Sequence, residues 1–520
     1  MRHFLDNEPI PGIENEYALM NQIVPNIPVE AINQLVKQLI GEKNITLGVF
    51  CPEKEGMKYP TEAELKGIID KVKSEKLEAY VDKVSDEPLM KEIPAGGKVV
   101  KTEDGAFGSK VLTLSNGVRV VLKKTDFKAD EVRMQAFSAG GNSMFNDEDA
   151  IQFTLMNQVV SLGGLGNFSA VDLDKVLAGK KASASSFVNS ITEGLSGSCS
   201  PKDMETMLQL AYLRFTAPRM DNDAYTSFIS RNKAALANAA ADPNTALSDT
   251  LNVALYNNHP RAVNVKAETL DKVDYNKVME LYKDRFADAS DFTFIFVGNI
   301  DEAVAVPLIE KYLGSLPSLN RNEKFRNVSP EIRKGEYENN FVREMETAKS
   351  TVLMVASGKC EYTQKNVILM SMLGQLLDIL YTQTVREEAG GTYGVSCGGS
   401  LSKYPVEKGV FQIFFDTDPE RRAQMVELID KGINDFIAQG PKAEDLSKVK
   451  EYMLKTYQQN QKENSYWMGV LNTKLWEGVD MNTGYEDTVN GITIDDLKKF
   501  AADFFGQKNM IEVSMSSPAK

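Results

Sequence analysis

The stretch from residue 386 to residue 400, REEAGGTYGVSCGGS, gathers the groups in this chain that are best suited to chemistry. Arg386 offers a fork of N–H donors, and Tyr393 offers one hydroxyl on a stiff ring. Gly391 and Gly394 would let the backbone of a partner approach closely. This combination suits the grip of an extended peptide or of an oxyanion. It cannot break a bond alone, because it contains no nucleophile–base pair and no set of metal ligands.

The same residues also have a purely structural interpretation. Arg386 could face the C-terminal dipole of the preceding helix, and Tyr393 could pack on a strand. Gly390, Gly391 and Gly394 could simply permit a tight turn from helix to strand. A phosphate-binding loop is not indicated, because no G-K-[ST] follows the glycines. The spacing of Arg and Tyr does not by itself decide between these interpretations.

Histidines and cysteines, the usual ligands of transition metals, are scarce. The chain has only His3 and His259, so the zinc motif H-x-x-E-H cannot occur anywhere in it. We expect His259, in the polar segment ALYNNHPRAVN, to be a surface or hydrogen-bonded residue, and we assign no role to His3. The cysteines are far apart without a C-x-x-C pair, which predicts free thiols; they are Cys51, Cys199, Cys360 and Cys397. We therefore expect no metal site in this chain.

The composition is that of a globular protein with a large core. The chain has 520 residues, of which 42% are hydrophobic and 25% charged, and its length predicts about three domains. A net charge of −14 argues against a nucleic-acid surface. No apolar run reaches the length of a membrane span, and the N-terminus has no apolar signal core. We expect a soluble protein, placed in the periplasm or cell envelope if a missing N-terminal segment carries a leader and in the cytoplasm otherwise.

A unit of helix, polar turn and strand recurs along the chain. It occupies residues 28–56, 274–299 and 493–518, and the strand of the first copy is predicted at residues 45–50. The last two copies lie roughly 220 residues apart, and at the same offset a strand followed by a proline-initiated helix recurs near Pro201 and Pro419. Residues 60–81 also show helical spacing. The chain is therefore predicted to contain a repeat.

Two complete repeats are predicted, at residues 106–320 and 340–520, with a linker at 321–339. Residues 1–85 correspond to the end of an earlier repeat, so we expect the chain to begin inside a domain, and residues 86–105 are predicted to be a linker. The first complete repeat opens with a hairpin around Ser115-Asn116-Gly117, then a strand ending in A-G-G and an apolar helix near residues 149–162. We expect an α+β fold of tandem α/β sandwich domains, each with an antiparallel-rich sheet covered by helices.

This order of hairpin, strand ending in A-G-G and apolar helix resembles the opening of a domain in the pitrilysin/insulinase family of zinc peptidases, which includes the mitochondrial processing peptidases. The resemblance covers essentially the whole chain. It implies repeated α+β domains, usually four, whose two halves close around a chamber that holds an extended peptide. In this comparison residues 1–85 match the end of the second domain, and the two complete repeats match the third and fourth.

Catalysis in the family uses an inverted motif, H-x-x-E-H, on the first helix of the first domain, with a further Glu as third zinc ligand. In the corresponding helix here the motif would fall on Gln152–Met156, which cannot supply two imidazoles and a carboxylate. The resemblance thus implies that the helix serves packing and that zinc is bound in the complete enzyme, outside this chain. The domain that carries zinc in the family is absent.

A second family signature is an Arg and a Tyr seven positions apart after a long helix of the last domain. Arg386 and Tyr393 have this spacing after the apolar segment NVILMSMLGQLLDILYTQ. The resemblance implies that both residues bind the substrate backbone and help to stabilise the tetrahedral intermediate. Gly391 and Gly394 would belong to the same substrate-binding loop.

These features predict the C-terminal, substrate-binding half of a zinc-dependent metalloendopeptidase that hydrolyses peptides in a closed chamber. The chain itself is predicted to be inactive alone. Its partners would be a peptide substrate and an N-terminal half, or a partner subunit, that carries H-x-x-E-H. An alternative stays open, in which the chain is a non-catalytic scaffold or the peptide-binding subunit of a two-chain peptidase. No other catalytic constellation supports an unrelated α+β enzyme.

Overall fold

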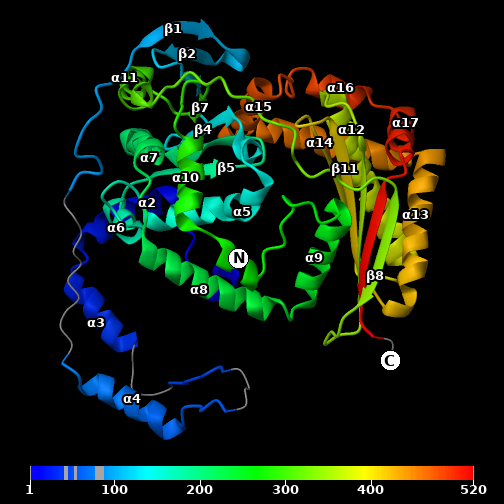
Figure 1. Cartoon of the computed structure of the whole chain (residues 1–520), viewed down its shortest axis with the longest axis horizontal. Helices are drawn as coiled ribbons and strands as arrows, with labels where there is room; N and C mark the ends of the chain where they lie inside the picture. The colour runs from blue at the N-terminus through cyan, green and yellow to red at the C-terminus, as the bar shows by residue number, and fades with distance from the viewer. Residues whose placement is uncertain (1, 40–44, 52–55, 77–86, 519–520) are drawn as a thin grey trace. The chain divides into compact units, whose positions relative to one another are not determined.

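Figure 1 shows the computed structural model of the chain, which describes residues 2–39, 45–51, 56–76 and 87–518. The chain divides into two compact units, residues 1–82 and residues 83–520. Every strand that the structure describes lies in the second unit.

The described part of the first unit consists of helices and loops. Helical spacing predicted α3 and α4, and a capping box between Thr61 and Glu64 begins α4. Apolar residues of α3 such as Ile32 and Leu35 remain exposed. The helices are α1 (Arg2–Asp6), α2 (Ile13–Ile23), α3 (Val29–Leu39) and α4 (Glu62–Ser74).

The strand predicted at residues 45–50 is absent, and this prediction was wrong. Residues 45–51 have no regular secondary structure, and Phe50 is exposed. An isolated strand cannot satisfy its own backbone hydrogen bonds, and the described part of this unit contains no strand with which it could pair. The polar turn predicted before it, at residues 41–44, lies outside the described residues.

A seven-stranded sheet forms the centre of the first complete repeat. Its order is β1-β2-β3-β7-β4-β6-β5, and all neighbours are antiparallel except β3 and β7. The predicted hairpin at Asn116-Gly117 is confirmed, since it joins β2 to β3 with Gly117 at a φ of 93°. The strands are β1 (Val99–Asp104), β2 (Lys110–Leu114), β3 (Arg119–Lys124), β4 (Val132–Ala139), β5 (Ala182–Val188), β6 (Thr192–Cys199) and β7 (Thr293–Gly298).

Part of the linker predicted at residues 86–105 is a strand instead. β1 pairs with β2 along its whole length at the edge of the sheet. Its residues are almost all exposed and include Lys101, Glu103 and Asp104. Charged residues are common on edge strands, where they discourage pairing with other chains, and here they hid the strand from a search for apolar alternation.

A five-stranded sheet forms the centre of the second repeat, in the order β10-β11-β9-β12-β8. This order and its single parallel pair, β8 with β12, reproduce β5-β6-β4-β7-β3 of the first sheet, which confirms the tandem α+β repeat. β8 begins inside the predicted linker 321–339, because Tyr337 and Phe341 alternate with polar residues and pack on an apolar cluster. The strands are β8 (Glu336–Val342), β9 (Ser350–Lys359), β10 (Val395–Ser402), β11 (Lys408–Thr417) and β12 (Met510–Ser516).

Helices cover both sheets (Figure 1). The recurring helices begin at clear caps, since the side chains of Asp274 and Thr493 accept N–H groups of the first turns of α10 and α17. The helices of the first repeat are α5 (Ala150–Val159), α6 (Ala170–Val176), α7 (Met204–Thr216), α8 (Asn222–Ala239), α9 (Pro243–Tyr256), α10 (Tyr275–Arg285) and α11 (Glu302–Tyr312). Those of the second are α12 (Gln364–Tyr381), α13 (Arg422–Gln439), α14 (Ala443–Asn460), α15 (Asn464–Trp476), α16 (Tyr485–Gly491) and α17 (Ile494–Phe505).

One helix of each repeat packs on the sheet of the other repeat. α15 of the second repeat places Met468 and Leu471 against Val121 and Ile295 of the first sheet. α9 of the first repeat packs in the same way on β12 of the second sheet. Buried Asn464 accepts a hydrogen bond from Thr125 and donates one to a carboxylate of the first repeat. This exchange explains why residues 83–520 form one compact unit.

Helix α12 is the core helix of the second repeat. Together with the turn that follows, it is the one segment in the described ranges, Gln364–Glu388, with the length and composition of a membrane span, which the sequence was predicted to lack. Half of its apolar window is buried inside the protein. α12 lies against β10 and against helices α13, α14 and α17, so its apolar character is explained by packing within the unit.

Candidate functional site

The predicted loop follows α12 through an unusual turn. After Tyr381 the helix widens into a π-helical segment, Thr382–Glu388, and the chain then passes through Gly390, at a φ of 58°, into β10. Such π-helical turns are rare and frequently occur at functional sites. Arg386 lies within this turn, and Tyr393 lies two residues before β10.

Both predicted site residues point into solvent. Arg386 is exposed, and 98% of Tyr393 is exposed. Across the described ranges, neither side chain makes a hydrogen bond or an ion pair with another residue. The structural interpretation in which Tyr393 packs on a strand is therefore wrong. Arg386 does lie in the last turn of its helix, so the interpretation through the helix dipole survives for that residue.

The two predicted glycines have different surroundings. A Cβ on Gly391 would lie 2.0 Å from the sulfur of Met425, so a larger residue there would require the Met425 side chain to move. Its N–H donates to the carbonyl of Val385 at 3.2 Å, and its own carbonyl accepts from Thr417 at 2.6 Å. Gly394 is exposed and has open space on its Cβ side. The structure thus gives Gly391 a packing role of its own, whereas Gly394 is free to be approached.

The helix that would carry the zinc motif is α5, and the residues at the predicted motif positions pack within the protein, as expected. Gln152 is buried, and its amide bonds to the carbonyl of Lys272 and the N–H of Asp274. Leu155 and Met156 also belong to the core. Residues 152–156 therefore include none of the side chains that a ligand in solvent would meet first, apart from Thr154.

The exposed face of α5 repeats the motif's spacing two residues later. Thr154, Asn157 and Gln158 lie at positions i, i+3 and i+4 and are exposed. Asn157 uses its amide to bond both the N–H and the carbonyl of Val188 in β5. Their hydroxyl and amide groups do not supply the imidazoles and carboxylate that a zinc site needs. Within the described ranges, no group of three His, Cys, Asp or Glu could hold a metal ion.

The remaining candidate ligands behave as expected. His259 follows α9 and accepts a hydrogen bond from the N–H of Arg261, so the prediction of a hydrogen-bonded histidine is confirmed. The cysteines are free, as predicted. Burial raises the pKa of the Cys199 thiol to about 12, which makes it unreactive.

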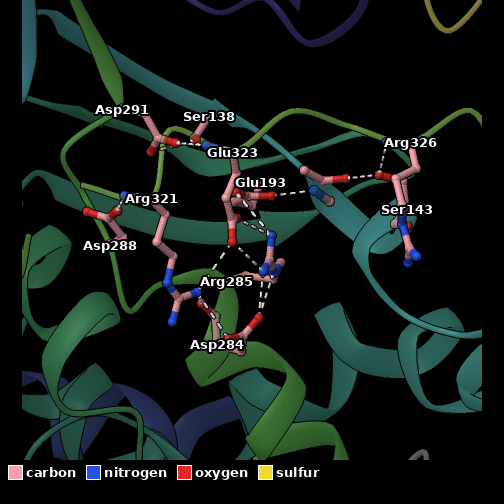
Figure 2. Close-up of polar contacts among 12 residues, drawn as sticks. Ser138, Ser143, Glu193, Asp284, Arg285, Asp288, Asp291, Arg321, Glu323 and Arg326 are labelled. Carbon is pink, nitrogen blue, oxygen red and sulfur yellow. Dashed lines mark hydrogen bonds and ion pairs between the residues drawn. The ribbon is translucent and has the colours of Figure 1, made fainter. Parts of the chain in front are cut away.

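A strap, defined here as residues 319–326, leaves the first repeat along a row of acidic side chains (Figure 2). Asp288 accepts the N–H groups of Leu319 and Arg321 at 2.9 and 2.6 Å. Asp291 accepts the N–H of Glu323 at 3.2 Å. Asn320 and Asn322, which lie between these residues, have left-handed φ values of 54° and 49°, so the strap is not a strand and the carboxylates satisfy its N–H groups instead. The first residues of the predicted linker are therefore fixed on the first repeat.

A buried ion cluster lies beneath the strap (Figure 2). The side chains of Arg285 and Glu193 are each only 2% exposed and approach to 4.0 Å. Arg285 also donates to Glu323 at 2.7 Å and to Asp284 at 2.5 Å. Burial raises the pKa of Glu193 to about 8, although Arg285 and the N–H of Gly141 act to lower it. At neutral pH, Glu193 is therefore largely protonated.

The A-G-G sequence that ended the predicted strand is explained by this cluster. A Cβ on Gly140 would lie 2.6 Å from the guanidinium of Arg285. A Cβ on Gly141 would lie 2.4 Å from the carbonyl of Asn189, and the φ of Gly141 is 56°. Both glycines thus let β4 end directly over the buried charges.

Sequence reasoning missed the residues that brace the site. Arg421 and Thr417 contact the turn that carries Arg386, although they lie beyond β10 in the chain. The sequence marked Pro419 only as the start of a helix. The available signal was Arg421 itself, a cation two residues after Pro419. It could not be linked to the glycine-rich turn from sequence, because only the pairing of β10 with β11 brings the two together.

The comparisons with known proteins agree with the resemblance seen in the sequence. Residues 272–453 match the family model described as peptidase M16 inactive domain. A zinc protease PQQL-like protein of Arabidopsis thaliana is 27% identical over 487 residues, which cover 90% of this chain and 48% of that protein. The chain spans about half the length of the curated relatives it matches.

Two solved structures share the fold over 99% of this chain and 57% of their own. The crystal structure of the periplasmic protease PqqL from Escherichia coli has a TM-score of 0.74 at 20% identity. The ferredoxin protease FusC, solved in complex with Arabidopsis ferredoxin, has a TM-score of 0.70 at 15% identity. With the repeated sheets, these findings show that residues 272–453 match the inactive domain of the M16 peptidases and that the chain shares its fold with M16-like zinc proteases.

Proposed function

We propose that this chain is the substrate-binding half of a zinc-dependent endopeptidase, and that Arg386 and Tyr393 are its contribution to the reaction. The observation that carries the proposal is that both side chains are exposed. They project into solvent without partners from a turn that the rest of the repeat holds in place. A tyrosine that is 98% exposed adds no packing to the fold, so its ring and hydroxyl are available for contact with another molecule.

The chemistry follows from the two groups. The guanidinium of Arg386 can donate two parallel hydrogen bonds to carbonyl oxygens of an extended peptide. The hydroxyl of Tyr393 can donate one to the oxygen that becomes negative when water adds to the scissile carbonyl. Zinc, held by another part of the complete enzyme, would supply the activated water. The residues of this chain do not fit that metal, because α5 presents amides and a hydroxyl where ligands are needed.

A partner half is supported by the relatives and by the first unit. The curated relatives are about twice as long as this chain, and one is named a zinc protease. Apolar residues of the first unit, including Leu35 and Ile32, are exposed on an amphipathic helix. We propose that the half carrying H-x-x-E-H covers them. The domain limits 1–85, 106–320 and 340–520 belong to this proposal.

The substrate and the compartment are proposed from the neighbours. FusC was solved with a protein substrate, ferredoxin, so we propose peptides or proteins as the substrate class. The Escherichia coli neighbour is described as periplasmic, and we propose the same compartment here. The alternative is a non-catalytic scaffold or peptide-binding subunit of a two-chain peptidase. An exposed Arg and Tyr without metal ligands would serve that role equally well, and the coding sequence upstream distinguishes the two.

The first prediction concerns metal and activity. The purified chain should bind less than stoichiometric zinc and should not cleave peptides, because its described residues offer no ligand set. Adding the half that carries H-x-x-E-H should produce both zinc binding and cleavage. Zinc content is measured by elemental analysis, and cleavage with a quenched fluorescent peptide. Stoichiometric zinc and cleavage by the chain alone would contradict the proposal.

A further inference from the structure

The turn between Arg386 and Tyr393 is fastened through three consecutive backbone carbonyls. The guanidinium of Arg421 donates to the carbonyl of Ala389 at 2.7 Å and to that of Gly390 at 2.8 Å. The hydroxyl of Thr417 donates to the carbonyl of Gly391 at 2.6 Å. All three acceptors lie just after the π-helical segment, in the turn between helix and β10, where no regular backbone hydrogen bonding satisfies them.

Arg421 is available for this task because nothing competes for it. It lies at the start of α13, just after the end of β11, and in the described ranges it forms no ion pair with a carboxylate. Among the residues that the structure describes, its remaining side-chain bond is a long one, 3.4 Å, to the amide oxygen of Gln424. A cation at the C-terminal end of a helix is also favoured by the helix dipole. The guanidinium is thus committed to the turn.

The far side of the turn has weaker support. Beyond Gly391, the side chain of Thr392 bonds only to the N–H and the carbonyl of Gly394, which belong to the same loop. Tyr393 therefore has no anchor of its own before β10 begins. Its direction, relative to Arg386, depends on how firmly residues 389–391 are held.

We propose that Arg421 is a positioning residue that aims Arg386 and Tyr393, with Thr417 as a secondary anchor. This inference rests on the proposed function of the two exposed residues. We call the hydrogen bonds from Arg421 and Thr417 to the carbonyls of residues 389–391 the clamp. Without Arg421, the carbonyls of Ala389 and Gly390 would be left to water, and the turn could adopt other conformations. Displacing a catalytic group by about 1 Å can cost about a hundredfold in rate, so the clamp has a measurable consequence.

The first test uses the chain alone and needs no activity. In Arg421→Gln, amide hydrogen exchange across residues 386–394 should rise at least about tenfold, while β11 and α14 keep their protection. In Arg421→Lys the exchange rate across residues 386–394 should lie between those of Arg421→Gln and the wild type, because the lysine can reach only one carbonyl at a time. Lys431→Gln is the matched control, because it removes one positive charge from an exposed ion pair of the same helix, α13. It should leave residues 386–394 unchanged.

The second test uses the complete enzyme. Arg421→Gln should lower kcat about tenfold or more and change KM less, since the clamp orients groups needed in the transition state. In a Tyr393→Phe background the same substitution should have a much smaller effect, because it acts through Tyr393 and Arg386. Thr417→Val should show the same pattern more weakly, and it tests the clamp if Arg421→Gln fails to fold.

The outcomes separate this inference from the proposed function. Unchanged exchange at residues 386–394 in both Arg421→Gln and Thr417→Val overturns the positioning role. So does increased exchange with full kcat in an enzyme that loses kcat on Tyr393→Phe. If Tyr393→Phe has no effect on kcat, the proposed function of Tyr393 fails instead, and hydrogen exchange alone decides whether Arg421 holds the turn.

Discussion

Replacing Tyr393 by phenylalanine should lower kcat of the complete enzyme by about a hundredfold, with little change in KM. The substitution removes one hydroxyl and keeps the ring. A hydrogen bond to the developing oxyanion is made in the transition state and hardly in the substrate complex, so its loss appears in kcat. The measurement is single-turnover cleavage of a defined peptide by this chain combined with the half that carries H-x-x-E-H.

The design of this experiment uses the exposure of the residue. Because 98% of Tyr393 is exposed, the substitution should not change the free energy of unfolding, and a loss of kcat cannot be a loss of fold. Tyr452→Phe is a matched control, since Tyr452 is 61% exposed and lies on α14, outside the turn that carries Arg386 and Tyr393. It should keep full kcat. An unchanged kcat in Tyr393→Phe would return this residue to the ordinary surface.

Local signals in the sequence predicted most of the regular structure. Asn116-Gly117 specified the first hairpin, because a glycine is needed where the turn takes φ to 93°. Asp274 and Thr493 marked the starts of α10 and α17, since both act as N-caps. The repeat was visible because helix and strand periodicities recurred at a constant offset. In each case the information lies within a few residues of the element.

The failures share a physical cause, which is dependence on distant partners. Residues 45–50 have the composition of a strand but no neighbour to pair with among the described residues of their unit. β1 lacks apolar alternation but pairs with β2 all the same. Which face of α5 is buried likewise depends on α10, on β5 and on the segment at Lys272, all distant in sequence.

The candidate site divides in the same way. Arg386 and Tyr393 could be found because their spacing is a local property of one loop. Arg421 could not, because it reaches the turn only when β10 and β11 form a hairpin and α13 begins at its end. The buried charges under the strap were equally hidden, since Arg285 and Glu193 come from elements separated by α7 to α9. Sequence identified the groups that we propose meet the substrate, and structure identified those that hold their turn.

The second large effect is expected at that buried cluster. Replacing Arg285 by methionine should lower the free energy of unfolding of residues 83–520 by about 3–5 kcal/mol. Methionine fills similar space but takes away the buried cation, so Glu323 and Asp284 keep only the more exposed Arg321 as a partner. Denaturant titration at pH 7 measures the loss, and Lys499→Met, at an exposed ion pair, should cost less than about 1 kcal/mol. If Arg285→Met lowered the free energy of unfolding by no more than Lys499→Met does, this account of the cluster would be contradicted.

Glu193→Gln gives the matched test of the same charges through pH. The pKa of Glu193 is about 8 in the folded protein, against an ordinary value of 4.5, because burial favours the protonated form. Between these values the folded state holds a proton that the unfolded state has lost. Stability therefore falls as pH rises across this window, by at most about 1.4 kcal/mol per pH unit from this group.

Glutamine stays neutral, so the variant should match the wild type near pH 4.5 and exceed it increasingly towards pH 8. In the Arg285→Met background the same substitution should restore part of the lost stability. A variant that instead becomes less stable than the wild type as pH rises would show that Glu193 is ionised and paired with Arg285.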